Sequence, residues 1–195
     1  RSPSEADVAR TLAQLIASAP ARVAVTTFAS NVARLKAVAD GAKACGREVV
    51  VVGRAMERVV QVARETGYLD GVQDFRGPDT YGYLPPDKVV ALCTGSQGET
   101  RAALSRISRD DHPDITLAKG DRVIFSSRTI PGNEKEVSRI QNNLARLDID
   151  VITADDALVH SSGHPRQGEL RELYAWLRPA ALIPMHGEPR HLRAH

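Results

Sequence analysis

Residues 88–93 read KVVALC, and the apolar run from Val89 to Cys93 decides the fold class. A strand with one face in water alternates apolar and polar residues, whereas a strand that is buried on both faces is apolar throughout. Residues 22–27 (RVAVTT) and 48–52 (EVVVV) have the same character. Continuous apolar strands are typical of parallel sheets that carry helices on both faces.

Helical patterns alternate with these strands. Apolar residues recur every three or four positions, which is the period of an amphipathic helix, in residues 4–18, 30–46, 56–66, 99–108, 133–147 and 165–178. Further strands are predicted at residues 122–127, 150–153, 157–160 (ALVH) and 181–185 (ALIPM). The sequence therefore predicts a three-layer α/β fold, in which a mostly parallel sheet has helices on both faces, as in Rossmann-like domains.

Composition narrows the range of functions. The 195 residues include 26 Lys and Arg against 24 Asp and Glu, and the net charge of +2 is too small to indicate nucleic-acid or membrane binding by bulk charge. No apolar run approaches the roughly 20 residues that span a bilayer, so neither a membrane anchor nor a secretory leader is expected. Cys45 and Cys93 have neither metal nor redox spacing, and we expect reduced thiols in a cytoplasmic protein.

The predicted strand ends carry unusual loops. Ligands of parallel α/β sheets bind beyond the carboxyl ends of the strands. Short loops rich in Ser, Thr and Gly follow those ends at residues 26–31, 53–57, 93–99, 125–134 and 160–165. Hydroxyls, glycine-turn N–H groups and helix N-termini all favour anions, phosphate above all. Helix capping explains any one of these loops, but five at one edge favour a crevice for an anion or a nucleotide.

Two further motifs contain histidines. Residues 160–165 read HSSGHP, and two histidines from a tight turn can donate to a phosphate oxygen or transfer a proton. The alternative is a capping loop with two solvated histidines. His186 follows the predicted strand 181–185, where a histidine is either a metal ligand or a satisfied strand-end side chain. We interpret His191 and His195 as surface residues.

Five segments together resemble a known family: TTFASN (26–31), TGSQGE (94–99), FSSRTIPGNE (125–134), HSSGHP (160–165) and PMHGE (184–188). In this order they are similar to the β-CASP region of ribonuclease J, a family of metallo-β-lactamase-fold nucleases. The resemblance implies a β-CASP domain inserted into a metallo-β-lactamase domain, with RNA threaded between the two. It implies that the intact enzyme is a metal-dependent 5′-to-3′ exoribonuclease with endonuclease activity. Thr100 departs from the proline that is expected in the family.

The resemblance also implies roles for single residues. His160 and His164 match the histidine loop at the scissile phosphate, and they are the expected catalytic residues. His186 matches a late metal ligand of the family. Phosphate or RNA binding is implied for Ser126, Ser127, Ser162, Gly163, Gly95 and Ser96.

Cofactors, partners and domains are implied in the same way. The intact enzyme is expected to hold two zinc ions, with manganese as the alternative metal. The family's H-x-H-x-D-H metal motif does not occur in these residues, so the chain alone is expected to hold no metal and to be inactive. Residues 1–180 are assigned to the β-CASP domain and 181–195 to the start of a return segment into a missing metallo-β-lactamase domain. The expected partners are 5′-monophosphorylated RNA, that domain and further copies in a homo-oligomer, without a membrane.

Two other functions remain as alternatives. One is a non-catalytic α/β module that binds a phosphosugar or a nucleotide, and the other is a regulatory or oligomerisation domain. The motifs HSSGH and PMHGE favour the nuclease, because a sugar-phosphate module has no need of a histidine at the end of a terminal strand.

Overall fold

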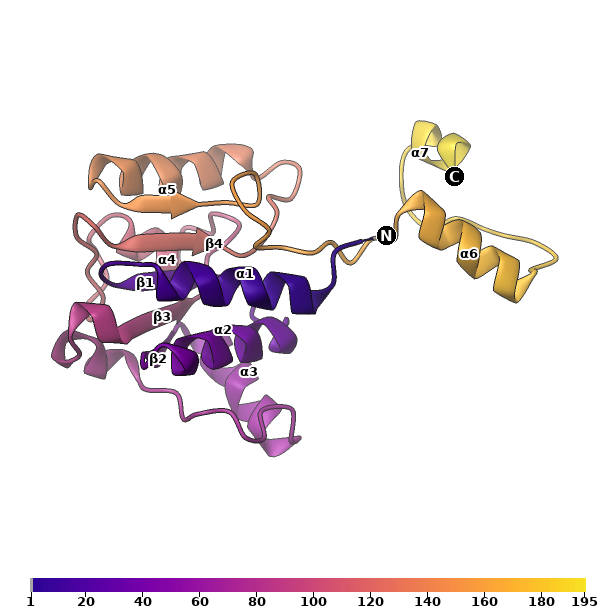
Figure 1. Ribbon diagram of the computed structural model, residues 1–195. Coiled ribbons are helices and arrows are strands. Elements are labelled where there is room, and N and C mark those ends of the chain that lie inside the picture. Colours follow the sequence, from indigo (N-terminus) through magenta and orange to yellow (C-terminus); the bar gives the residue numbers. More distant parts are fainter. Residues whose placement is uncertain (1) are drawn as a thin grey trace. The chain divides into compact units, whose positions relative to one another are not determined.

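The computed structural model describes residues 2–195, which divide into two compact units (Figure 1). The larger unit comprises residues 4–161, and the smaller unit comprises residues 162–195 with residues 2–3. No helix in the described part of the chain is both long and apolar enough to cross a membrane.

The larger unit contains a five-stranded sheet in which every pair of neighbours is parallel, in the order β2-β3-β1-β4-β5. The strands are β1 (Val23–Thr26), β2 (Glu48–Val52), β3 (Val89–Cys93), β4 (Arg122–Phe125) and β5 (Asp150–Ile152). The helices are α1 (Glu5–Ala17), α2 (Val32–Ala44), α3 (Arg54–Glu65), α4 (Ala103–Ile107) and α5 (Glu134–Arg146), with two short 3-10 helices, η1 (Pro78–Tyr83) and η2 (Pro86–Lys88). The predicted α/β fold is confirmed.

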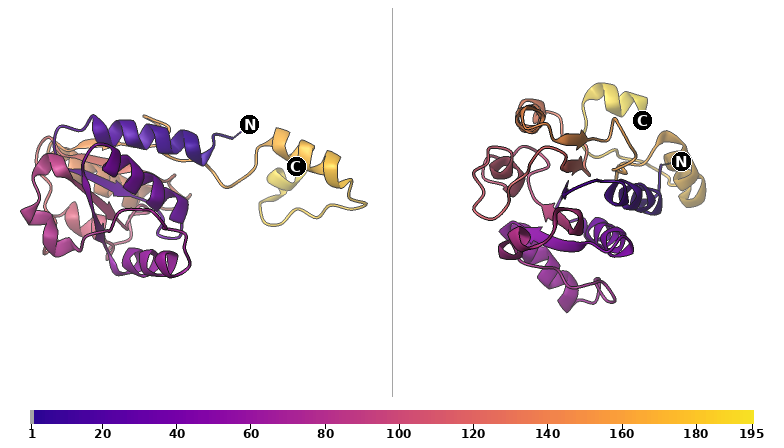
Figure 2. Two further views of the ribbon diagram at one scale, coloured as in Figure 1. Left: turned by 60° about the horizontal axis from the view of Figure 1, so that its bottom comes forward. Right: turned by 60° about the vertical axis from the view of Figure 1, so that its left-hand side comes forward.

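Helices cover both faces of the sheet. One core joins α1, α2 and α3 to the sheet, and a second core joins α4 and α5 to the opposite face. Figure 2 shows α1 and α2 together on one side of the strands. Along β1, Val23 and Val25 belong to the first core and Ala24 to the second, which is why these three residues are all apolar.

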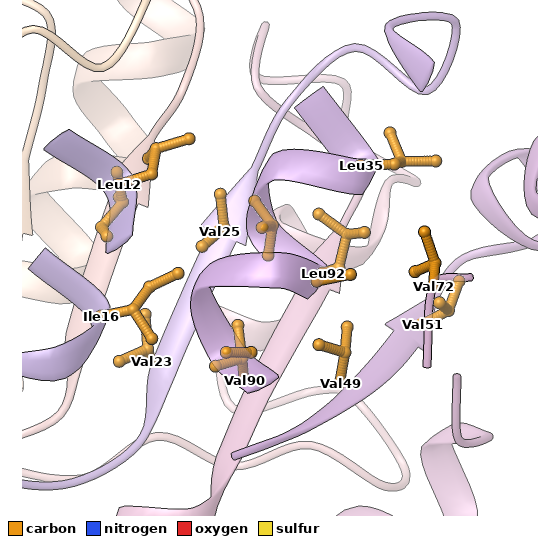
Figure 3. Packing of buried hydrophobic residues seen from close by; sticks show 14 of the residues in the cluster. Leu12, Ile16, Val23, Val25, Leu35, Val49, Val51, Val72, Val90 and Leu92 are labelled. Atoms are coloured by element: carbon orange, nitrogen blue, oxygen red, sulfur yellow. The ribbon is translucent and has the colours of Figure 1, made fainter. Parts of the chain in front are cut away.

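Close packing of α1 on β1 illustrates the first core (Figure 3). Leu12 and Ile16 of α1 lie beside Val23 and Val25, and all four side chains are fully buried. Complete burial of one Leu or Ile side chain stabilises the folded state by about 1.5–3 kcal/mol. The two helix-covered faces therefore hold the sheet rigid beneath its loops.

Residues 157–160 (ALVH) do not form the predicted strand. The carboxylate of Asp156 accepts hydrogen bonds from the N–H and hydroxyl of Thr153, at 2.9 and 2.7 Å, and folds the preceding residues into a turn. The carbonyl of Val159 then accepts side-chain donors from Arg34 and Ser126 in place of a strand partner. Within residues 157–160, Val159 is buried in the core and Ala157 packs against it partly buried.

The predicted strand at residues 181–185 (ALIPM) is also wrong, because these residues have irregular backbone. A strand needs a hydrogen-bonded neighbour, and the described residues provide none for this segment. Pro184 has no N–H to donate, and Ile183 and Met185 are 88% and 86% exposed. An apolar run alone does not distinguish a strand from an extended segment.

The smaller unit contains two helices, α6 (Gln167–Leu177) and α7 (Pro189–Ala194). The first confirms the helix predicted at residues 165–178. The N–H and hydroxyl of Ser2 donate to the carboxylate of Glu169 at 2.8 and 2.9 Å, and the hydroxyl of Tyr174 lies 2.5 Å from Nε2 of His195. Polar contacts of this kind hold the unit together, because none of its described residues is buried.

Helix α4 begins at Ala103 instead of residue 99, because the TGSQGE loop (94–99) folds back on itself. The N–H of Leu104 donates to the carbonyl of Thr94 at 3.0 Å. Gly98 in this loop has a φ of +81°, and a Cβ built there would lie 2.4 Å from Cβ of Glu136 in α5. The loop therefore approaches the first turn of α5 as closely as a glycine allows.

We predict that Gly98→Ala destabilises the protein more than Gly71→Ala does. Gly71 also has a positive φ, of +74°, but no atom lies within 4 Å of its virtual Cβ. Gly71→Ala is the control, and backbone strain alone should lower its free energy of unfolding by about 1–2 kcal/mol. Overpacking against α5 should lower the free energy of unfolding of Gly98→Ala by roughly 1–3 kcal/mol more. Urea unfolding of both variants measures the difference. Equal losses would show that α5 moves aside freely.

Candidate functional site

Loops rich in hydroxyl groups gather at one edge of the sheet, as the sequence predicts. All five strands are parallel, so their carboxyl ends lie together. Thr27 follows β1, Ser96 lies in the loop after β3, and Ser126 and Ser127 follow β4. None of these four residues is more than 5% exposed. Buried hydroxyls need hydrogen-bond partners, either within the protein or on a ligand.

A cleft of about 670 Å³ lies beyond the ends of β1, β2 and β3. β1 and β3 are neighbours, but the helices that follow them, α2 and α4, cover opposite faces of the sheet. Their loops therefore diverge and leave a crevice, the usual position of a ligand in such folds. The predicted residues Gly95 and Ser96 line this cleft together with Thr27.

The cleft is lined by both positive and negative side chains. Three arginines border it: Arg54, Arg101 and Arg106. Arg106 donates to the carbonyl of Asp111 at 2.6 Å, whereas Arg54 and Arg101 make no side-chain hydrogen bond or ion pair within residues 2–195. Three acidic residues also border it: Glu57, Glu99 and Asp114. This arrangement suits a ligand with an anionic group and neutral hydrogen-bonding parts.

A second hollow, of about 300 Å³, lies beyond the ends of β4 and β5. Ser127 lines it with Arg128 and Thr129, and Thr153 contributes from the end of β5. Glu134 and Asp155 lie on its wall as well. Hydroxyl groups beside a guanidinium can bind a phosphate oxygen. Ser127 therefore lies where the sequence predicts a phosphate-binding residue.

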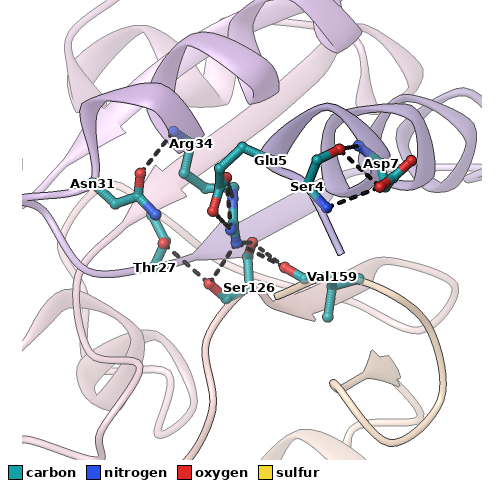
Figure 4. A network of polar contacts seen from close by, with 8 residues as sticks. All are labelled: Ser4, Glu5, Asp7, Thr27, Asn31, Arg34, Ser126 and Val159. Carbon is teal, nitrogen blue, oxygen red and sulfur yellow. Dashed lines mark hydrogen bonds and ion pairs between the residues drawn. The ribbon is translucent and has the colours of Figure 1, made fainter. Parts of the chain in front are cut away.

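Ser126 has a different environment, because a buried guanidinium holds it in place (Figure 4). Nη1 of Arg34 donates to the hydroxyl of Ser126 at 2.5 Å and to its carbonyl at 3.1 Å. The hydroxyl of Ser126 donates to the carbonyl of Val159 at 2.7 Å, and the hydroxyl of Thr27 donates to the carbonyl of Ser126 at 3.1 Å. Both functions of this hydroxyl are used within the protein.

Sequence reasoning missed Arg34, although a signal was present. Arg34 lies four residues before Val38 and eight before Ala42, so it falls on the face of α2 that is buried against the sheet. Its side chain is 0% exposed, and its other nitrogens donate to the carboxylate of Glu5, which is 43% exposed. An arginine at an inward helical position indicates a buried ion pair.

His160 follows Val159 directly and is partly buried. Its Nδ1 atom is buried and has no hydrogen-bond partner among the described residues. Burial, and after it the positive charge of Arg34, hold the pKa of His160 below its ordinary value of 6.5. The ring is therefore neutral at pH 7, which is the form that accepts a proton.

The HSSGHP loop crosses the boundary between the two compact units. His160 and Ser161 belong to the larger unit, whereas Ser162, Gly163 and His164 are exposed residues of the smaller unit. Within the smaller unit, the N–H of His164 donates to the hydroxyl of Ser162 at 3.1 Å. The loop is thus a connection between units as well as a candidate site.

His186 lies beside His164 in the smaller unit. The two rings stack with their centroids 6.0 Å apart and their planes inclined by 25°. His186 has a φ of +42°, and Gly187 has a φ of +114°, so the chain turns sharply at this point. Glu188 forms an ion pair with Arg190 at 2.9 Å, and its N–H donates to Nδ1 of His191.

A complete metal site is not formed by this part of the chain. Among the described residues, no group of three His, Cys, Asp or Glu side chains is arranged to hold an ion. A structural zinc needs four ligands and a catalytic zinc at least three from the protein. His186 alone, even with His164 beside it, does not fit such a site without ligands from elsewhere.

Comparison with known families identifies the class of domain. The model described as "Ribonuclease J, beta-CASP domain" matches residues 20–144, and "Zn-dependent metallo-hydrolase RNA specificity domain" matches residues 148–195. The part of the larger unit that spans residues 20–144, with strands β1 to β4, is thus a β-CASP domain. The chain belongs to the ribonuclease J family, and the resemblance seen in its motifs is confirmed.

Several relatives match over almost the whole chain. Ribonuclease J of Sinorhizobium meliloti is 53% identical over 194 residues, which cover 100% of this chain and 34% of the relative. Ribonuclease J of Mycolicibacterium smegmatis is 47% identical, with 100% and 35% covered, and that of Thermus thermophilus is 39% identical, with 97% and 33% covered. The chain spans about a third of the length of these relatives.

We predict that His160 makes the protein less stable as the pH falls. Its pKa is lower in the folded protein than the ordinary 6.5, so below about pH 6.5 the unfolded chain binds more protons and the free energy of unfolding decreases. His160→Gln should flatten this decrease between about pH 7 and 5. Urea unfolding at several pH values measures it, with His191→Gln in the other unit as the control. Parallel curves for wild type and His160→Gln would contradict the prediction.

Proposed function

We propose that this chain is the RNA-binding β-CASP region of a metal-dependent ribonuclease that acts as a 5′-to-3′ exonuclease and as an endonuclease. The observation that carries the proposal is the gathering of hydroxyl- and glycine-rich loops at one edge of the sheet. Membership of the ribonuclease J family supports the same function. The whole protein's preferred substrate in this proposal is 5′-monophosphorylated RNA.

Each predicted site residue has a place in this proposal. His160 and His164 act at the scissile phosphate, and the neutral ring of His160 is suited to accepting a proton. Phosphate oxygens are bound by Gly95 and Ser96 in the first cleft, by Ser127 in the second hollow, and by Ser162 and Gly163 in the smaller unit. Ser126 contributes by holding the loop, because its hydroxyl is already bonded.

Zinc is the proposed metal of the intact enzyme, in agreement with the zinc-dependent family model that matches residues 148–195. Two ions are proposed, with manganese as the alternative. Bound metal would supply an activated water and neutralise phosphate charge. His186 would contribute one imidazole ligand, and the other ligands would come from outside residues 2–195.

The proposal extends to the rest of the protein. Residues 181–195 begin the return to a metallo-β-lactamase domain, and residues 1–180 belong to the β-CASP domain. The intact enzyme is proposed to be a cytoplasmic homo-oligomer. A nucleotide or phosphosugar remains the second candidate ligand. The cleft of about 670 Å³ has the size of a small-molecule site, and it lies where the helices after β1 and β3 pass to opposite faces of the sheet.

The activity is tested with the intact protein that contains this chain. We predict metal-dependent degradation of 5′-monophosphorylated RNA and its loss in His186→Ala, on the order of 100-fold, together with a lower metal content. His191→Ala, five residues further on, is the matched control and should keep both metal and activity. Metal analysis and exonuclease rates decide the matter: a full metal complement in His186→Ala would show that His186 is not a ligand.

RNA binding at the first cleft predicts a distinct salt dependence. Arg54→Ser and Arg101→Ser should each weaken binding of single-stranded RNA and lower the slope of log affinity against log salt by about 0.7, the value for one phosphate contact. Binding is measured in the intact protein with a chelator present to prevent cleavage. Lys43→Ser in the last turn of α2 is the control, because that helix end lies near the amino end of β2. A cleft that binds nucleotides but not RNA would leave RNA affinity unchanged in both arginine variants.

A further inference from the structure

Both connections between the compact units lie close in sequence to residues that bind one buried guanidinium. The chain passes from one unit to the other between Pro3 and Ser4, and again between Ser161 and Ser162. Arg34 of α2 binds Glu5, just after the first connection, and Val159, just before the second. All of these bonds lie within the larger unit, and Figure 4 shows them converging on one side chain.

The geometry uses every nitrogen of the guanidinium. Nε and Nη2 of Arg34 donate to the carboxylate of Glu5, at 3.1, 2.9 and 2.9 Å. Nη1 donates to the carbonyl of Val159 at 2.8 Å and to the two oxygens of Ser126. The carbonyl of Val159 also accepts the hydroxyl of Ser126 at 2.7 Å. Two donors, one of them fully buried, thus fix the peptide that leads into His160.

An arginine is suited to this position where a lysine is not. The guanidinium is planar and its donors point in fixed directions, so it binds one carboxylate and a separate carbonyl at the same time. A charge without exposure to water must be paired, and Glu5 provides the counter-charge. Removal of the Arg34 guanidinium leaves the carbonyl of Val159 with one donor, the hydroxyl of Ser126, and removes the cation that is paired with Glu5.

We propose that Arg34 is a positioning residue, which holds His160 in its reactive place through the carbonyl of Val159 and the hydroxyl of Ser126. This inference rests on the proposed role of His160 in RNA cleavage. Arg34 is 0% exposed in a helix that covers the sheet, so it acts through its neighbours and not on the substrate. Through Glu5 it fixes the start of α1 at the other connection.

Arg47 supplies a matched control. It is also buried, at 5% exposed, and it also donates to carbonyl groups, those of Ala19 and Ala21 at 2.6 and 2.7 Å. These carbonyls precede β1, at the amino edge of the sheet. Arg47→Gln therefore removes a comparable buried donor far along the strands from His160, and it reports the cost of a purely structural loss.

The experiment compares Arg34→Gln with Arg47→Gln in the intact protein. Hydrogen exchange should accelerate around residues 4–7 and 158–161 in Arg34→Gln, and only around residues 18–23 and 47 in Arg47→Gln. Single-turnover cleavage at saturating RNA should fall roughly 10- to 100-fold in Arg34→Gln, as expected for a misplaced group, while RNA affinity stays within about threefold. Arg47→Gln should cleave at the wild-type rate.

The pH profile separates positioning from general loss of stability. Arg34, Glu5 and Arg128 are the charged groups that act on His160. Loss of the Arg34 charge should move the His160 limb of the cleavage profile to higher pH, whereas Arg47→Gln should leave it in place. If Arg34→Gln fails to fold, Ser126→Ala keeps the charge and removes one donor to Val159, and it should lower the rate by about threefold or more.

Two outcomes would overturn the inference: equal rates and pH profiles for the two arginine variants, or no change in hydrogen exchange around residues 158–161 in Arg34→Gln. Failure of the proposed function looks different. It would appear as wild-type protein that does not cleave RNA, or as His160→Ala that cleaves at the wild-type rate. The hydrogen-exchange comparison tests the structural role of Arg34 in either case.

Discussion

The parallel direction of all five strands is the constraint on which the rest of the structure depends. A parallel strand is reached only by a crossover, so every strand begins at one edge of the sheet and ends at the other. The turns that follow the strands are therefore crowded together, and they bring Thr27, Ser96, Ser126 and Ser127 into a small, buried region. A polar region of this kind is stable only if its hydroxyls and carbonyls are paired. The edge that can bind a ligand is thus also the edge that most needs internal hydrogen bonds.

Arg34 meets this need. The pairing of α1 with α2 brings Glu5 to one side of the guanidinium, and the ends of β1 and β4 bring Thr27 and Ser126 to the other. The beginning of α1 is itself fixed by a capping box between Ser4 and Asp7. Burial of the charge is therefore compensated by partners from three segments of the chain, Glu5, Ser126 and Val159, while Thr27 binds the carbonyl of Ser126. In the same network the carbonyl of Val159 accepts two side-chain donors in place of a strand partner. His160 follows Val159 directly in the chain.

The fold was largely predictable from sequence because local pattern and tertiary environment agree. The apolar runs at residues 49–52 and 89–93 are buried on both faces, as such runs require. The apolar pattern gave wrong strand predictions at two short runs, residues 157–160 and 181–185, which are not part of the sheet. Val159 is buried in the core without a strand partner, and no strand lies beside residues 181–185 in the part of the chain that the structure describes. Neither fact is encoded in hydrophobicity, because both depend on which backbone groups find partners.

The site was predictable to a different extent. Parallel strands guarantee that the loops containing Gly95, Ser96, Ser126 and Ser127 share an edge, and sequence is enough for that inference. Which hydroxyls are free was not predictable, because it depends on the buried Arg34. The unit boundary within the HSSGHP loop was equally hidden, since a change of unit leaves no mark on a run of Ser and Gly.

The contrast between the two units bears on the proposed metal ligand, His186. His160 lies in a region with a buried core and a paired guanidinium, so its backbone is fixed by its surroundings. His186 lies in a unit with no buried residue among those described, at a turn of positive φ, and its ring stacks on that of His164. A metal ligand needs its ring to be oriented by neighbours. If His186 binds a metal as proposed, the orientation of its ring therefore depends on groups outside this unit, whereas the backbone before His160 is held by hydrogen bonds within this chain.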